Sequence, residues 1–222
     1  MNPNLVIIGT RDRPHNAIRA FAQLKTVSVE SDYLIIINED QTDLYPEIEG
    51  VMCEVVPNGL GCIGKANHVL HKYWDDYATI TGIDDDCMVT TQNWDLTLAA
   101  SINERGFGLS YGNDTFQGQN LPTKVMISTN ILRPLGFWAP KTIFHLYADD
   151  FWKLLGQNLG ALDYFPSVMM EHWHYLNGKA PIDDLYKSIY DPQMVENDRN
   201  AWSAYQRDQF AIDIERVKTA LG

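Results

Sequence analysis

The chain has 222 residues, of which 45% are hydrophobic and 21% charged, and its formal net charge is −12. That size and balance fit one globular domain with a sizeable core, and no apolar run is long enough to span a bilayer. The acidic excess argues against a broad surface for nucleic acid or anionic membrane, because Lys and Arg supply affinity for phosphate, although it leaves room for a local basic groove. We therefore expect a soluble cytoplasmic protein with no membrane partner.

Strands and helices are predicted to alternate along the first 86 residues. Continuous apolar runs predict four buried strands, at residues 5–8, 33–37, 51–56 and 77–83. Helical spacing of apolar residues predicts helices over 15–25 and 65–73. Alternation of this kind implies an α/β fold with a mainly parallel sheet flanked by helices, which binds ligands outside the carboxyl ends of its strands. Polar clusters follow all four predicted strands.

The second half is less regular. Periodicity predicts helices at 93–103, 129–135 and 146–159, and an amphipathic helical tail at 198–221. Short strands are predicted at 107–111, 125–128 and 167–170. Because no internal repeat, low-complexity tract or obvious linker divides the chain, we expect a single domain over residues 1–222.

Three consecutive carboxylates, Asp84, Asp85 and Asp86, follow the strand predicted at 77–83. Carboxylates this close together repel one another and lose solvation when buried, and a divalent cation removes that cost. Mg²⁺ and Mn²⁺ suit oxygen ligands and often bridge a carboxylate to substrate phosphates. An exposed acidic turn is the alternative, but the apolar segments on both sides of the triad favour a metal site.

Two further polar pairs are candidates for the same site. His172 and His174 are two residues apart, so an extended backbone would turn both imidazoles to one face, and one of them beside Asp86 would favour Mn²⁺ over Mg²⁺. Asp149 and Asp150 open a predicted helix, where a carboxylate could take the proton of an attacking hydroxyl. The alternatives are hydrogen-bonded histidines and acids that merely complement the helix dipole.

A glycine-rich segment, Gly59 to Lys65, precedes the helix predicted over 65–73. Glycines let a backbone approach a ligand closely, and a helix N-terminus attracts phosphate, although an ordinary strand-to-helix turn has the same composition. Three loop cations could reach a diphosphate or could simply be solvated: Arg11, Arg13 and Lys179.

Together these segments resemble the GT-A glycosyltransferases, most closely the family-2-like branch, over positions 5 to 192. The loop from Thr10 to Pro14 resembles that family's opening T-R-x-R-P loop, and Asp84-x-Asp86 resembles its DXD motif. Asn38-Glu39-Asp40 matches the family's acidic residues at the nucleobase. Gly61 to Asn67, which reads G-C-I-G-K-A-N, resembles its G-x-x-x-A-x-N region, and Asp149-Asp150 resembles the acidic pair that contains its catalytic base. The segment Glu171-His172-x-His174 followed by Gly178-Lys179 resembles the H-x-H…G-K segment of a small bacterial and phage subgroup.

The resemblance implies a Rossmann-like GT-A fold with a nucleotide-sugar-binding half at 1–92, an acceptor and catalytic half at 93–195, and a C-terminal helix at 196–222. It implies an inverting transfer from a nucleoside-diphosphate sugar, with UDP as the expected nucleotide. Mn²⁺ or Mg²⁺ would be held by Asp84, Asp86 and either His172 or His174. Asp150 would be the base, with Asp149 as the alternative because the family pair is often Glu-Asp. The implied donor contacts are Thr10, Arg11, Arg13, Asp40, Gly61, Lys65, Asn67, Asp84, Asp85 and Lys179.

The sequence leaves the identity of the acceptor open. Some phage members of the subgroup glycosylate hydroxymethylated pyrimidines in DNA, which would place the protein in the host cytoplasm, with the target base in a pocket near Asp150. Four cations that could line one groove for DNA are Lys124, Arg133, Lys141 and Lys153. A glycan or a small molecule is the other acceptor. A nucleotidyltransferase and a non-catalytic nucleotide-sugar-binding or carbohydrate-binding module are the rival functions.

Overall fold

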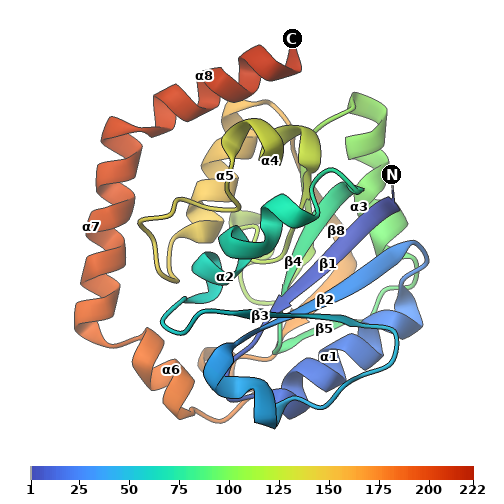
Figure 1. Ribbon diagram of the computed structural model, residues 1–222. Helices are drawn as coiled ribbons and strands as arrows, with labels where there is room; N and C mark the ends of the chain where they lie inside the picture. The colour runs from blue at the N-terminus through green and yellow to red at the C-terminus, as the bar shows by residue number, and fades with distance from the viewer. Residues whose placement is uncertain (1) are drawn as a thin grey trace.

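Residues 2–222 are described by the computed structural model in Figure 1, and they fold around an eight-stranded sheet with the order β3-β2-β1-β4-β7-β6-β8-β5. The first four strands are β1 (Asn2–Gly9), β2 (Ser31–Asn38), β3 (Met52–Val56) and β4 (Tyr77–Asp84). β1 pairs in parallel with both β2 and β4, and β2 pairs in parallel with β3. These are the four strands predicted from the apolar runs, and their carboxyl ends share one edge of the sheet.

The second half adds β5 (Cys87–Val89), β6 (Leu109–Asn113), β7 (Val125–Ser128) and β8 (Leu162–His172). β7 runs antiparallel to β4 and β6, and β5 runs antiparallel to β8, so the other six strands share one direction. The prediction of a mainly parallel α/β sheet is therefore confirmed. β8 is longer than the segment predicted at 167–170, and it contains a bulge, since Phe165 pairs with Gly112 but Met169 pairs with Asn113.

Helices cover both faces of the sheet because alternate strand residues point to opposite sides. Val6 and Ile8 pack with the helices on one face, α1 (Pro14–Val27) and α3 (Trp94–Arg105). Leu5 and Ile7 pack on the other face with α2 (Cys62–Val69), α4 (Thr129–Leu135) and α5 (Ala148–Asn158). Short 3₁₀ turns complete the connections: η1 (Glu39–Leu44), η2 (Leu70–Lys72), η3 (Gly118–Asn120) and η4 (Tyr175–Asn177).

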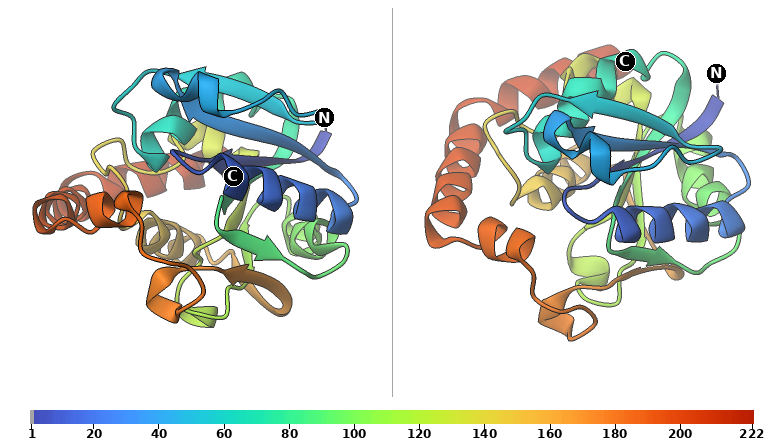
Figure 2. Two further views of the ribbon diagram at one scale, coloured as in Figure 1. Left: turned by 90° about the horizontal axis from the view of Figure 1, so that it is seen from below. Right: turned by 60° about the horizontal axis from the view of Figure 1, so that its bottom comes forward.

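The C-terminal part consists of α6 (Asp184–Ile189), α7 (Pro192–Asp208) and α8 (Phe210–Leu221). The tail predicted at 198–221 is helical, but the single C-terminal helix expected at 196–222 is two helices, because α7 already begins at Pro192, the chain turns at Gln209 and α8 packs against α4. The Tyr205 hydroxyl donates a 2.8 Å hydrogen bond to Asp213 across this break. In both views of Figure 2 the orange segment between β8 and α7 lies at the periphery, with α6 beside the start of α7. No helix within residues 2–222 is both long enough and apolar enough to cross a bilayer.

Candidate metal and donor site

The acidic triad forms the connection between β4, which ends at Asp84, and β5, which begins at Cys87. The side chain of Asp84 is 46% exposed, whereas those of Asp85 and Asp86 are only 5% and 7% exposed. The triad is therefore no solvated acidic turn, and its two buried carboxylates need compensating partners.

Each of Asp84 and Asp85 has a cation beside it. Asp84 Oδ2 lies 2.7 Å from Nζ of Lys124, whose side chain is 2% exposed. Asp85 accepts a 2.7 Å hydrogen bond from the Thr10 hydroxyl and a 3.4 Å bond from Arg13. Burial, together with the charge of Asp86, nevertheless raises the pKa of Asp85 to about 7. Thr10 and Arg13 thus contact the triad, although their predicted contacts with a donor stay predictions.

Asp86 joins residues from both halves of the chain. Its Oδ1 lies 3.2 Å from Nε2 of His172, which the β5–β8 pairing of Cys87 with His172 brings alongside. Its Oδ2 accepts a 2.6 Å hydrogen bond from the Tyr186 hydroxyl and lies 3.6 Å from Arg13. Burial opposes ionisation of Asp86, but His172 and Lys124 outweigh it and hold its pKa below the usual value.

One ligand atom each from Asp84, Asp86 and His172 lie within 4.8 Å of one another, so this group can hold a metal ion. Within the described residues, Asp86 Oδ1 is buried and has no hydrogen-bond partner, although His172 Nε2 is close to it. An orphaned buried oxygen beside an imidazole nitrogen is explained by a cation between them. Two carboxylates and one imidazole form a donor set that suits Mn²⁺.

His174 is held differently from His172, although their rings lie 4.9 Å apart, as an extended segment predicts. Its Nδ1 accepts a 3.2 Å hydrogen bond from the Leu176 amide and so caps η4. Burial, with the neighbouring charge of His172, lowers the pKa of His174 to about 4, so the ring is neutral at pH 7. His172, and not His174, belongs to the group with Asp84 and Asp86.

The loop after β1 links the triad to the carboxyl end of β2. Arg11 donates 3.2 and 2.8 Å hydrogen bonds to the two oxygens of Asp40, and a third, of 3.2 Å, to Asn38. Lys65 is 3% exposed and donates a 2.6 Å hydrogen bond to the carbonyl of Thr10. Its burial lowers the pKa of Lys65 to about 8. The structure thus brings Arg11, Asp40 and Lys65 together around one loop.

Gly61 and Asn67 fix the start of α2 and its neighbours. A Cβ on Gly61 would lie 2.5 Å from the carbonyl oxygen of Phe144, so only glycine fits there. The amide of Asn67 accepts a 2.6 Å hydrogen bond from the Trp138 amide and donates a 2.9 Å bond to the Ala139 carbonyl. Both residues therefore hold segments from the second half of the chain against α2.

Arg13 and Lys179 line a pocket of about 360 Å³ beside the N-terminus of α1, together with Arg19, Trp173 and Tyr186. Arg13 donates 2.7 and 2.8 Å hydrogen bonds to the two oxygens of Asp183, and its guanidinium lies 4.1 Å from the centre of the Tyr186 ring. Lys179 pairs with Glu171 and donates a 3.3 Å bond to the Thr115 hydroxyl. Lys179 is thus already neutralised by a side chain.

The two acids at the start of α5 have different electrostatic environments. Burial raises the pKa of Asp149 to about 6, and the charges that act on it include Asp150, Lys124 and Asp84. Burial also raises the pKa of Asp150, which is countered by the charge of Lys153. The charges acting on Asp149 therefore include Asp84 of the acidic triad, whereas the charge acting on Asp150 is Lys153 of the same helix, α5.

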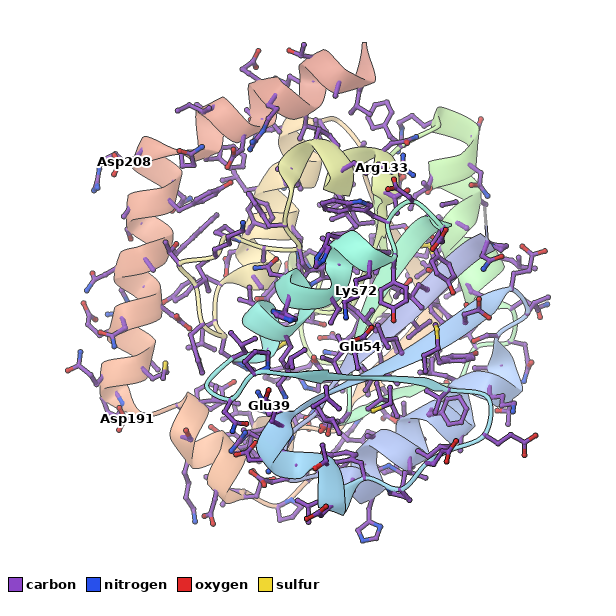
Figure 3. All side chains as sticks on the ribbon, viewed as in Figure 1. Glu39, Glu54, Lys72, Arg133, Asp191 and Asp208 are labelled. Carbon is purple, nitrogen blue, oxygen red and sulfur yellow. The ribbon has the colours of Figure 1, made fainter. Side chains whose placement is uncertain are left out.

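The sequence did not predict that Tyr186 and Asp183 belong to the site. It also did not predict the position of Lys124 within the site. Asp183 caps α6 by accepting from the Tyr186 amide over 2.9 Å, and an acid before a short apolar segment was the only available signal. Lys124 lies buried in the acid cluster and not on a surface groove. Arg133 pairs with Asp75, which precedes β4. Asp84 ends the same strand, roughly 25 Å away. Figure 3 likewise shows Arg133 far from Glu39. The four cations do not line one groove.

Comparisons with known proteins agree on the fold. No family model and no curated protein matches the sequence. Among solved structures, TarS of S. aureus has a TM-score of 0.54 and 12% identity over 76% of this chain, which spans 36% of the TarS chain. The mannosyltransferase PcManGT of Pyrobaculum calidifontis, in complex with GDP-Man and Mn²⁺, has a TM-score of 0.55 and 12% identity over 98% of this chain and 73% of its own. Rv0371c of Mycobacterium tuberculosis, in complex with manganese, has a TM-score of 0.51 and 9% identity over 76% and 89%.

The chain therefore has the GT-A fold, which confirms the fold predicted from the motifs. At such identities the likeness defines the fold and leaves the chemistry to the site itself. That site is an Asp-Asp-His group at the carboxyl end of a central parallel strand.

Proposed function

We propose that this protein is a metal-dependent glycosyltransferase that takes its sugar from a nucleoside-diphosphate donor. The observation that carries the proposal is the group of Asp84, Asp86 and His172 at the carboxyl end of β4 in a GT-A fold. A divalent cation held there supplies positive charge that stabilises the departing diphosphate. Arg13 and Lys124 add fixed positive charge beside the same carboxylates.

For the chemical step we propose a single displacement with inversion. The acceptor hydroxyl oxygen attacks the anomeric carbon, the bond from that carbon to the diphosphate oxygen breaks, and the hydroxyl proton moves to a carboxylate oxygen at the start of α5. The sequence favoured Asp150 as this base. The electrostatic environment supports Asp149 instead, because Lys124 and Asp84 are among the charges that act on it. Its raised pKa also makes it a better proton acceptor at neutral pH.

For the donor we propose a UDP-sugar, with Arg11, Asp40 and Asn38 beside the base. The support is the placement of this hydrogen-bonded cluster at the carboxyl ends of β1 and β2. GDP-Man, which PcManGT binds, is the rival donor.

For the acceptor we propose a neutral glycan or small molecule, because Lys124 is buried beside Asp84 and Arg133 lies at the far end of β4, so neither adds to a cationic groove with Lys141 and Lys153. A hydroxymethylated pyrimidine in DNA is the alternative, and it would need a different positive surface.

A panel of nucleotide sugars tests the proposal. The protein is incubated with UDP-, GDP-, dTDP- and ADP-sugars and Mn²⁺, and the released nucleotide is quantified. We expect slow hydrolysis of one donor class, abolished by EDTA and by Asp86→Asn but retained by the surface variant Asp163→Asn. Release of pyrophosphate from a nucleoside triphosphate would indicate a nucleotidyltransferase instead. Donor binding without turnover, with or without acceptors, would indicate a binding module.

A further inference from the structure

Tyr186 makes the one contact with the acidic triad that comes from α6. Its hydroxyl donates a 2.6 Å hydrogen bond to Asp86 Oδ2, and the residue is 5% exposed. The other oxygen of Asp86, Oδ1, is the one beside His172 Nε2. The two oxygens of one carboxylate therefore have separate surroundings, a protein donor on one side and the candidate metal position on the other.

The ring of Tyr186 is fixed from several directions. The Arg13 guanidinium covers it at 4.1 Å, and Asp183 accepts a hydrogen bond from its backbone amide over 2.9 Å. The rings of His174 and Tyr175 lie 4.6 and 4.8 Å away. A hydroxyl held this firmly can fix the rotation of the carboxylate that accepts its hydrogen bond.

We infer that Tyr186 is a positioning residue of the metal site: its hydroxyl holds Asp86 so that Oδ1 faces the cation shared with Asp84 and His172. This inference rests on the proposed function, since it assumes a metal ion at that group. A hydrogen bond to the oxygen of a ligand carboxylate that does not bind the metal changes metal affinity by about 10- to 100-fold, because it orients the ligand before the metal binds. If Tyr186 instead competed with the metal for Asp86, its hydroxyl would weaken binding, so the sign of the effect separates the two roles.

The test is the dissociation constant for Mn²⁺ of the full chain, measured by electron paramagnetic resonance of free Mn²⁺ without donor or acceptor. For Tyr186→Phe we expect this constant to rise by about 10- to 100-fold. The matched control is Tyr205→Phe, because Tyr205 is 8% exposed and donates a 2.8 Å hydrogen bond to Asp213, which is 2% exposed. Both variants lose one buried tyrosine–aspartate hydrogen bond, but only one loses it at the metal site. We expect Tyr205→Phe to lower the thermal midpoint and leave Mn²⁺ binding unchanged.

An unchanged or lower dissociation constant for Mn²⁺ in Tyr186→Phe overturns the inference. An equal loss of Mn²⁺ affinity in Tyr186→Phe and Tyr205→Phe also overturns it, because that result would reflect stability alone. In these outcomes the parent protein still binds Mn²⁺, so the proposed function stands. A parent protein that binds no Mn²⁺ overturns both. As a second readout, saturating Mn²⁺ should restore the donor hydrolysis rate of Tyr186→Phe, because the hydroxyl positions a ligand and touches no substrate.

Discussion

The two sides of the candidate metal site are built from frameworks of unequal rigidity. Asp84 ends β4, which is hydrogen-bonded to β1 on one side and β7 on the other. His172 ends β8, whose last three residues pair with the three-residue β5, while the His172 amide donates a 3.0 Å hydrogen bond to the Asp114 carbonyl on the other side, and Tyr186 comes from the six-residue α6. One metal ion would therefore be shared between a core strand, β4, and a peripheral segment formed by the end of β8 and α6. Local opening of that segment would disturb the site long before the sheet unfolds.

Asp86→Asn should break the connection between the two sides and have the largest effect. Asp86 contacts His172, Tyr186 and Arg13, so replacing it by asparagine removes its negative charge and leaves one oxygen where two served the metal position and Tyr186. We expect Mn²⁺-dependent activity to fall by about 1,000-fold or more, the equivalent of several kcal/mol of charge stabilisation. Calorimetric titration with Mn²⁺ and the donor measures the accompanying loss of binding, and parental affinity in the variant would contradict the assignment of Asp86 as a metal ligand.

Asp149→Asn and Asp150→Asn sharpen the comparison at the start of α5. We expect Asp149→Asn to keep donor binding but to slow transfer by roughly 100- to 10,000-fold, and Asp150→Asn to have a much smaller effect. Single-turnover rates with bound donor measure the difference. If Asp150→Asn proves the slower enzyme, the base is the residue that the sequence first favoured.

The pH profile gives an independent check on Asp149. Burial raises its pKa to about 6, and a base must be ionised to accept a proton. The transfer rate should therefore be half-maximal near pH 6, approach its full value about one pH unit higher, and fall about tenfold per unit well below pH 6. An acid limb near the ordinary pKa of an aspartate would contradict this, and Asp149→Asn should remove the limb altogether.

Leu34→Ala probes the core side alone. Leu34 on β2 is fully buried, and its truncation should cost about 2–5 kcal/mol of unfolding free energy through lost contacts and a cavity. Because the sheet stays folded below its transition, the Mn²⁺ dissociation constant of the variant should match the parent. Urea unfolding and Mn²⁺ titration of one preparation check both statements, and a large change in metal affinity would mean that the two sides are not separable.

Asp183→Asn probes the peripheral side and should have the smallest effect. Asp183 is partly exposed, so weakening its pairing with Arg13 should cost about 1 kcal/mol or less of global stability. Hydrogen exchange of the α6 amides should nevertheless become faster, while β1 amides keep their protection. Equal acceleration in both elements would show that α6 is part of the same cooperative unit as the sheet.

The parallel core and the acidic triad could be predicted because their signals are local. Four apolar runs mark β1 to β4, and the triad directly follows the last of them. β5 was missed because three residues carry no periodicity, and the break at Gln209 was missed because no glycine or proline marks it. Which of Asp149 and Asp150 faces the site depends on helix phase, since neighbours on a helix point about 100° apart. Tyr186 depends on a contact with Asp86 one hundred residues away, for which the sequence has no local signal.

The length of β8 beyond its bulge is part of the site's metal preference. Residues 166–168 lie outside the pairing with β6, and Val168 among them is fully buried in the core. Beyond the bulge Met170, Glu171 and His172 pair in succession with Val89, Met88 and Cys87. One residue inserted after Met170 would bring Glu171 opposite Cys87 and exchange an imidazole for a carboxylate. An all-oxygen donor set of that kind suits Mg²⁺, so a one-residue change in strand length would shift the preference of the site from Mn²⁺ towards Mg²⁺.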